Sequence, residues 1–141
     1  MPRFEPFAGI RYSADRVTLG DVVAPPYDVI GPDQRAALEA RSPHNVVHVD
    51  LARDPDDPDP YQPARCLLTE WMAEGVLERD AEPAYYVYRM GWRTAEGEPR
   101  QTSGVLGLLA LPEGDGSVLP HERTMPKPLG DRLQQLRACR A

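Results

Sequence analysis

The richest group of side chains for chemistry lies near the end of the 141-residue chain. Its seven members carry ionisable or hydroxyl groups: His121, Glu122, Arg123, Thr124, Lys127, Asp131 and Arg132. We expect a carboxylate next to an imidazole and a guanidinium in sequence to have its pKa tuned by them and to take a proton from a substrate hydroxyl. Glu122 and His121 are therefore the candidate catalytic residues, with Glu122 as the general base.

The basic and hydroxyl members of this cluster are suited to hold an anion such as a phosphate group. Lys127 would act as a point charge, and Arg123 and Arg132 through planar guanidinium forks. Thr124 precedes a predicted helix and would cap its N-terminus, where backbone N–H groups attract an anion. The fixed charges leave a slight positive excess, enough for one phosphate if Asp131 points away. The competing interpretation is a capped helix whose paired charges lie on a solvated face.

Two motifs near the N-terminus are predicted to close this anion pocket from its other side. Arg11 places a charge at the end of a short strand, and Tyr27 and Asp28 follow a double proline. Asp28 would orient a ligand hydroxyl or bind Mg²⁺ through water, so a nucleotide with Mg²⁺ is the candidate cofactor. The alternative for this motif is a rigid turn with a packed tyrosine ring.

Several familiar site patterns are absent from the sequence. His121-Glu122 lacks the second histidine of a zinc protease, because Met125 stands at that position. There is no GxxxxGK[ST] phosphate-binding loop, and Cys66 and Cys139 are far apart without a CxxC pair. Residues 54–59 lack the glycine and the distant glutamate of a calcium loop, so we expect a solvent-facing aspartate run. No metal site is predicted.

Composition limits the classes of partner. The net charge of −6 argues against a nucleic-acid partner, because such binding relies on neutralising phosphates with lysine and arginine. We find no long apolar run and no signal-peptide pattern, so we expect no membrane partner and a cytoplasmic location. A hydrophobic content of 41% is typical of a folded domain, and the 16 prolines and 11 glycines predict many loops.

Short apolar stretches in the first third of the chain predict strands. Residues 4–12 are typical of a short strand with a loop, and residues 46–51 alternate as a strand does. Residues 21–30 predict two β-like pieces that break at Pro25-Pro26, because proline fixes φ and lacks a backbone donor.

The best hairpin candidate joins residues 84–92 to residues 100–111. Tyrosines and other apolar side chains alternate along the first of these segments, and residues 95–98 contain turn formers.

Three helices are predicted from capping signals and apolar spacing. The first spans residues 31–41 with Pro32 in its first turn. The second spans residues 60–74 and ends at Gly75, and the third spans residues 128–140. Helices interleaved with strands predict an α+β fold with a mixed sheet, in one domain over residues 1–141.

Four motifs in order along the chain resemble a bacterial and archaeal family catalogued as domain of unknown function 1015. The motifs are Phe4-Glu5-Pro6-Phe7 with Gly9-Ile10-Arg11-Tyr12, residues 21–30, Pro43-His44-Asn45-Val46-Val47, and residues 119–124. The resemblance implies that the domain is the N-terminal portion of a longer protein and is incomplete at its C-terminus. It implies no settled activity, although a distant likeness of the family to ParB-like proteins, some of which phosphorylate free serine, is consistent with phosphate chemistry.

These residues lead to one functional hypothesis and one alternative. We expect the chain to bind a small-molecule ligand, either phosphorylated or a nucleotide, and to transfer phosphate to a small hydroxyl substrate. The alternative is a non-catalytic ligand-sensing or protein-interaction module.

Overall fold

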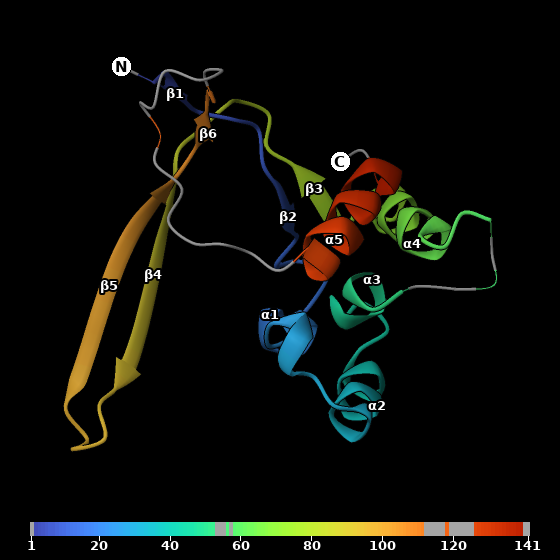
Figure 1. Ribbon diagram of the computed structural model, residues 1–141, viewed down its shortest axis with the longest axis horizontal. Helices are drawn as coiled ribbons and strands as arrows, with labels where there is room; N and C mark the ends of the chain where they lie inside the picture. The colour runs from blue at the N-terminus through green and yellow to red at the C-terminus, as the bar shows by residue number, and fades with distance from the viewer. Residues whose placement is uncertain (1, 53–55, 57, 112–117, 119–125, 140–141) are drawn as a thin grey trace. The chain divides into compact units, whose positions relative to one another are not determined.

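The computed structural model describes residues 2–52, 56, 58–111, 118 and 126–139, with the backbone alone for residues 126–128 (Figure 1). The chain forms two compact units. Unit 1 comprises Met1–Gly9 and Arg79–Glu122, and unit 2 comprises Ile10–Glu78 and Arg123–Ala141. Helices and small antiparallel sheets confirm the predicted α+β class.

Unit 1 is built on the predicted hairpin. Strands β4 (Tyr86–Arg93) and β5 (Pro99–Leu106) pair antiparallel along their whole length. Gly97 adopts a φ of +84° in the connecting turn, a conformation that side chains with a Cβ rarely adopt. A second antiparallel pair joins β1 (Phe4–Glu5) to β6 (Leu108–Leu109). The alternation of the sequence therefore located the hairpin correctly.

The Tyr86 hydroxyl ties the N-terminal segment to this hairpin. It donates to Oδ2 of Asp80 at 2.5 Å and accepts the backbone N–H of Gly9 at 2.6 Å. The ring packs on Phe7 with 4.9 Å between centroids. A Cβ on Gly9 would lie 2.6 Å from the tyrosine oxygen, so any other residue there would displace the Tyr86 ring.

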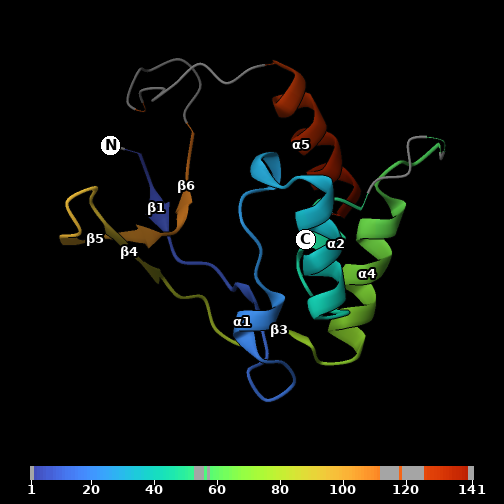
Figure 2. The same cartoon turned by 90° about the horizontal axis from the view of Figure 1, so that it is seen from below.

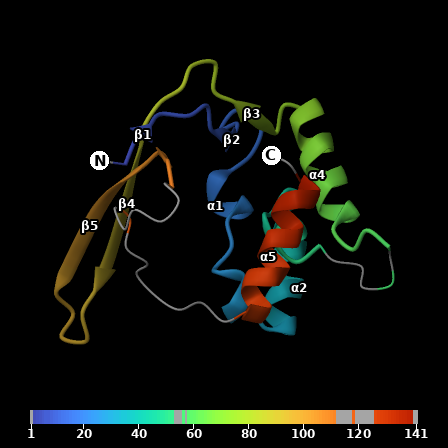
Figure 3. The same ribbon diagram turned by 45° about the horizontal axis from the view of Figure 1, so that its top comes forward.

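Unit 2 is mainly helical (Figure 2). Its elements are β2 (Ile10–Tyr12), α1 (Leu19–Val22), the 3₁₀ turn η1 (Tyr27–Val29), α2 (Pro32–Arg41), α3 (Val47–Asp50), α4 (Gln62–Ala73), β3 (Leu77–Arg79) and α5 (Pro126–Cys139). Strands β2 and β3 pair, and α4 lies beside α5 (Figure 3). Helix α4 also packs against α3. No helix in the described residues has the length and apolar content to cross a membrane.

The core of unit 2 lies under α4. Trp71 is 3% exposed and packs with Val49, Ala64 and Leu77. The apolar spacing of residues 60–74 correctly predicted this buried face. Gly75 follows the helix at a φ of +71°, as expected of a glycine C-terminal cap.

Two strand predictions are wrong. Residues 46–51 contain helix α3, and residues 21–30 contain the end of α1 and the turn η1. Asn45 explains both departures, because its fully buried side chain has three backbone partners. Its Nδ2 donates to the carbonyls of Asp21 and Val23 at 2.7 and 3.0 Å, and its Oδ1 accepts the Val47 N–H at 3.0 Å. These contacts take up backbone groups that a strand would use in a ladder, and they outweigh the β propensity of the valines.

Candidate functional site

The predicted site residues fall into three groups in the structure. Arg11 lies on β2, Tyr27 and Asp28 lie on η1, and Arg132 lies on α5. Lys127 belongs to the first turn of α5, where only the backbone is described. The remaining four predicted residues lie outside the described residues: His121, Glu122, Arg123 and Thr124.

The guanidinium of Arg132 stacks on the ring of Tyr27 within unit 2. The guanidinium carbon lies 4.0 Å from the centre of the tyrosine ring, within the range of a cation–π interaction. The tyrosine belongs to the double-proline motif and the arginine to the C-terminal helix. The structure thus joins two members of the predicted pocket that are far apart in sequence.

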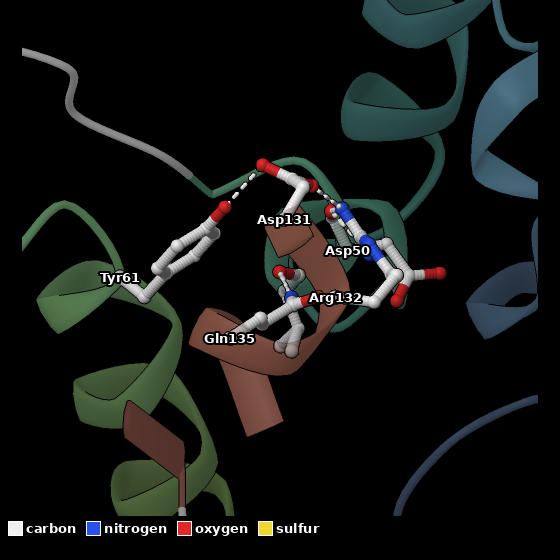
Figure 4. Close-up of polar contacts among 6 residues, drawn as sticks. Asp50, Tyr61, Asp131, Arg132 and Gln135 are labelled. Carbon is white, nitrogen blue, oxygen red and sulfur yellow. Dashed lines mark hydrogen bonds and ion pairs between the residues drawn. The ribbon is translucent and has the colours of Figure 1, made fainter. Parts of the chain in front are cut away.

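Polar contacts hold the same guanidinium in place (Figure 4). Nη2 of Arg132 donates to Oδ2 of Asp131 at 2.8 Å, and Nη1 and Nη2 each lie 3.4 Å from the Asp50 carbonyl oxygen. Nε is buried and has no hydrogen-bond partner within the described part of the chain. The side chain remains 26% exposed, so a small solute can approach it.

Asp131 pairs with Arg132, so the condition that its carboxylate points away from the basic residues is not met. Its Oδ2 pairs with Arg132, and its Oδ1 accepts the hydroxyl of Tyr61, which is 3% exposed. Gln135 lies one turn further along α5 and donates to the Val49 carbonyl at 2.9 Å (Figure 4). The arginine charge is therefore balanced by an aspartate that also has a second partner.

Asp50 is a member of the site that sequence reasoning missed. It is half-buried at the end of α3, and burial raises the pKa of its carboxyl while Arg132 opposes the rise. Burial, reinforced by the Asp50 charge, raises the pKa of Tyr12 to about 12. The Tyr12 hydroxyl donates to the His44 carbonyl at 2.8 Å. An aspartate closing the apolar run of residues 46–49 was the available signal.

Arg11 and Asp28 occupy exposed positions. Arg11 borders an apolar cavity of about 290 Å³ together with Leu68 and Trp71. Asp28 follows Tyr27 directly on η1. Of the N-terminal residues predicted to form the pocket, Tyr27 is thus the one for which the structure gives a contact with Arg132.

The Pro43-His44-Asn45 motif has a structural role in this fold. Asn45 anchors the segment before the double proline, as described above. The His44 ring packs edge-on against Trp71 at 5.6 Å, and its Nε2 lies 3.6 Å from Oε2 of Glu74. The motif therefore connects the segment leading to Tyr27 with the core of unit 2.

The arrangement presents a guanidinium held by the Asp131 carboxylate, the Asp50 backbone carbonyl and a tyrosine ring. An arginine held in this way can bind a planar or tetrahedral oxyanion through its N–H fork. Within the described residues, no three histidine, cysteine or acidic side chains are grouped to hold a metal ion. The guanidinium therefore offers N–H donors of the kind that recognise an oxyanion.

Comparison with known proteins identifies the family of this chain. The model of the family described as protein of unknown function (DUF1015) matches residues 4–141. No curated protein and no solved structure matches the chain. Because the family match covers almost the whole sequence, the chain belongs to the DUF1015 family.

Proposed function

We propose that the chain binds the phosphate group of a small phosphorylated molecule or nucleotide at Arg132. The observation that carries this proposal is the stacking of Arg132 on Tyr27 at 4.0 Å. A guanidinium already ordered by an aromatic ring and by a backbone carbonyl loses little conformational freedom when an anion binds. The double-proline motif and the C-terminal helix therefore each contribute one side chain to the proposed anion-binding site.

The pairing of Arg132 with Asp131 must yield for an anion to bind. Asp131 would keep the hydroxyl hydrogen bond from Tyr61 while Nη2 of Arg132 exchanges the Asp131 carboxylate for a ligand oxygen. Because Asp131 keeps this hydrogen bond, giving up Arg132 costs less free energy than leaving its carboxylate with no hydrogen-bond partner.

Phosphate transfer to a small hydroxyl substrate is the activity that we propose for this site. Such transfer depends mainly on positioning and on charge neutralisation, which arginine and lysine supply. Asp50 beside Arg132 is a candidate proton acceptor in addition to the predicted Glu122. A nucleotide with Mg²⁺ would be the phosphate donor.

Thermal unfolding with phosphate, pyrophosphate and MgATP tests the binding step. A site with a Kd of about 1 mM contributes about 1.4 kcal/mol at about 10 mM phosphate. This corresponds to a rise of about 5 °C in Tm for a domain of this size. Arg132→Ala combined with Lys127→Ala should remove the rise.

Arg65→Ala is the matched control, because Arg65 also forms a 2.8 Å ion pair with an aspartate, Asp59, but stacks on no aromatic ring of the described residues. It should keep the full phosphate response. Equal responses in wild type, the double variant and the control would refute binding at Arg132.

The interaction-module alternative is favoured by the hairpin of unit 1. Alternate residues of a strand project from the same face, so Tyr88, Met90 and Trp92 share a face of β4. Tyr88 is 53% exposed and Trp92 is 47% exposed. If the face serves a partner, serine at both aromatic positions should abolish partner capture and leave Tm within about 2 °C. A large drop in Tm would assign these rings to the packing of the chain itself.

A further inference from the structure

A second hollow in unit 2 lies between α2 and the extended segment that precedes Tyr27. We name it the α2 groove. Its walls are residues 23–25 on one side and Gln34, Ala37, Leu38 and Arg41 on the other, and its volume is about 360 Å³. This volume lies near the lower end of the range of pockets that hold small molecules.

One face of α2 accounts for the shape of the groove. Positions 34, 37, 38 and 41 follow the spacing that brings residues onto one side of a helix. Leu38 forms a floor that is 3% exposed. Ala37 contributes only a methyl group, which leaves the hollow open beside the floor.

The polar groups of the groove lie at its two ends. Gln34 and Arg41 are seven positions apart, which is about 10 Å along a helix. Within the described residues, no hydrogen bond or ion pair engages the Arg41 guanidinium, whereas Arg35 on the same helix pairs with Glu39 at 2.7 Å. A positive group at one end of an apolar hollow complements an anion with an apolar body.

We infer that the α2 groove binds a small organic carboxylate whose carboxylate pairs with Arg41 and whose apolar body lies over Ala37 and Leu38. Gln34 would hydrogen-bond a polar group at the far end of a longer ligand. The ligand differs from the phosphate of the Arg132 site, and the inference does not depend on that proposal.

Hexanoate is the test probe. Acetate, which keeps the carboxylate without the long apolar chain, and 1-hexanol, which keeps the chain without the charge, are the controls. Titration of the ¹⁵N-labelled chain should give saturable shifts of the amides of Ala37, Leu38 and Arg41 with hexanoate at low millimolar Kd. Acetate and hexanol should each bind at least about tenfold more weakly, because each lacks one of the two contacts. Phosphate should leave these three amides unmoved.

Three variants test the charged contact and the apolar contact of the ligand separately. Arg41→Ala should weaken hexanoate binding by about tenfold, the effect of losing one charge-assisted hydrogen bond. Ala37→Leu should block binding by filling the hollow, while retaining a residue that favours helix. Arg35→Ala, on the same helix outside the groove, should bind as the wild type does.

Two results would overturn the inference. One is the absence of saturable shifts at these amides up to about 20 mM hexanoate, roughly tenfold above the expected Kd. The other is equal binding by Arg41→Ala and wild type. The amide spectrum of each variant also reports whether it is folded, so a folding failure is distinguished from a lost contact.

Discussion

Asn45→Ala should destabilise unit 2 more than the loss of a single hydrogen bond would. The side chain is fully buried and joins α3 to the segment that leads to the double proline. The substitution removes an acceptor from the Val47 N–H and a donor from the carbonyls of Asp21 and Val23. Water cannot easily replace the amide at the buried Val47 N–H.

The magnitude follows from those three partners. Leaving the Val47 N–H buried without an acceptor costs about 1–3 kcal/mol. Losing the two bonds to carbonyls costs about 1 kcal/mol each. The total of about 3–5 kcal/mol is a large part of the 5–15 kcal/mol that stabilises a typical domain.

Urea unfolding followed by tryptophan fluorescence can measure the effect in unit 2 alone. The chain has two tryptophans, Trp71 in the core of unit 2 and Trp92 on the hairpin of unit 1. In a Trp92→Phe background, the fluorescence therefore reports unit 2. Gln101→Ala, which removes an exposed amide from β5, is the control and should change the free energy by less than about 0.5 kcal/mol. A loss below about 1 kcal/mol for Asn45→Ala would refute the reasoning.

Other substitutions test unit 1 and the Arg132 site. Gly9→Ala should cost about 1–3 kcal/mol in thermal unfolding, because the new Cβ would lie 2.6 Å from the Tyr86 oxygen, whereas Gly104→Ala meets no atom within 4 Å and should be tolerated. Burial raises the pKa of Asp50 above its ordinary 3.8, so its contribution to stability is greatest below pH 3.8 and falls as pH rises through the folded-state pKa. Asp50→Asn should remove that dependence and raise Tm at pH 7; a lower Tm there would contradict this origin. Tyr27→Leu should weaken phosphate binding severalfold in calorimetric titration while preserving Tm within a few degrees, and unchanged affinity would exclude a role for the ring.

Local signals in the sequence were sufficient for several elements. Pro32 begins α2 as predicted, because a proline in the first helical turn loses no hydrogen bond. Gly75 and Gly97 mark a helix end and a hairpin turn, since each adopts a positive φ. The apolar spacing before Gly75 predicted the buried face of α4 around Trp71. In each case the residues that decide the structure are neighbours in the chain.

The candidate site was predictable only in part. The sequence pointed to Arg132 and Tyr27 as ligand-binding residues, and the structure brings them into contact. It did not indicate Asp50, because an aspartate after alternating valines is equally typical of a strand end. The hydrogen bond from Tyr61 to Asp131 was not predicted either, because Tyr61 directly precedes α4 and Asp131 lies on α5.

The sequence by itself determined the turns, the caps and the amphipathic faces, all of which depend on residues a few positions apart. Only the tertiary structure decided that residues 47–50 form a helix and that Tyr27 lies beneath Arg132. Both outcomes depend on contacts between distant segments: the Asn45 amide with the backbone of residues 21–23, and α5 with the segment after the double proline. A buried amide must satisfy its hydrogen-bonding groups within the fold, and that requirement overrode the local β preference of the valines.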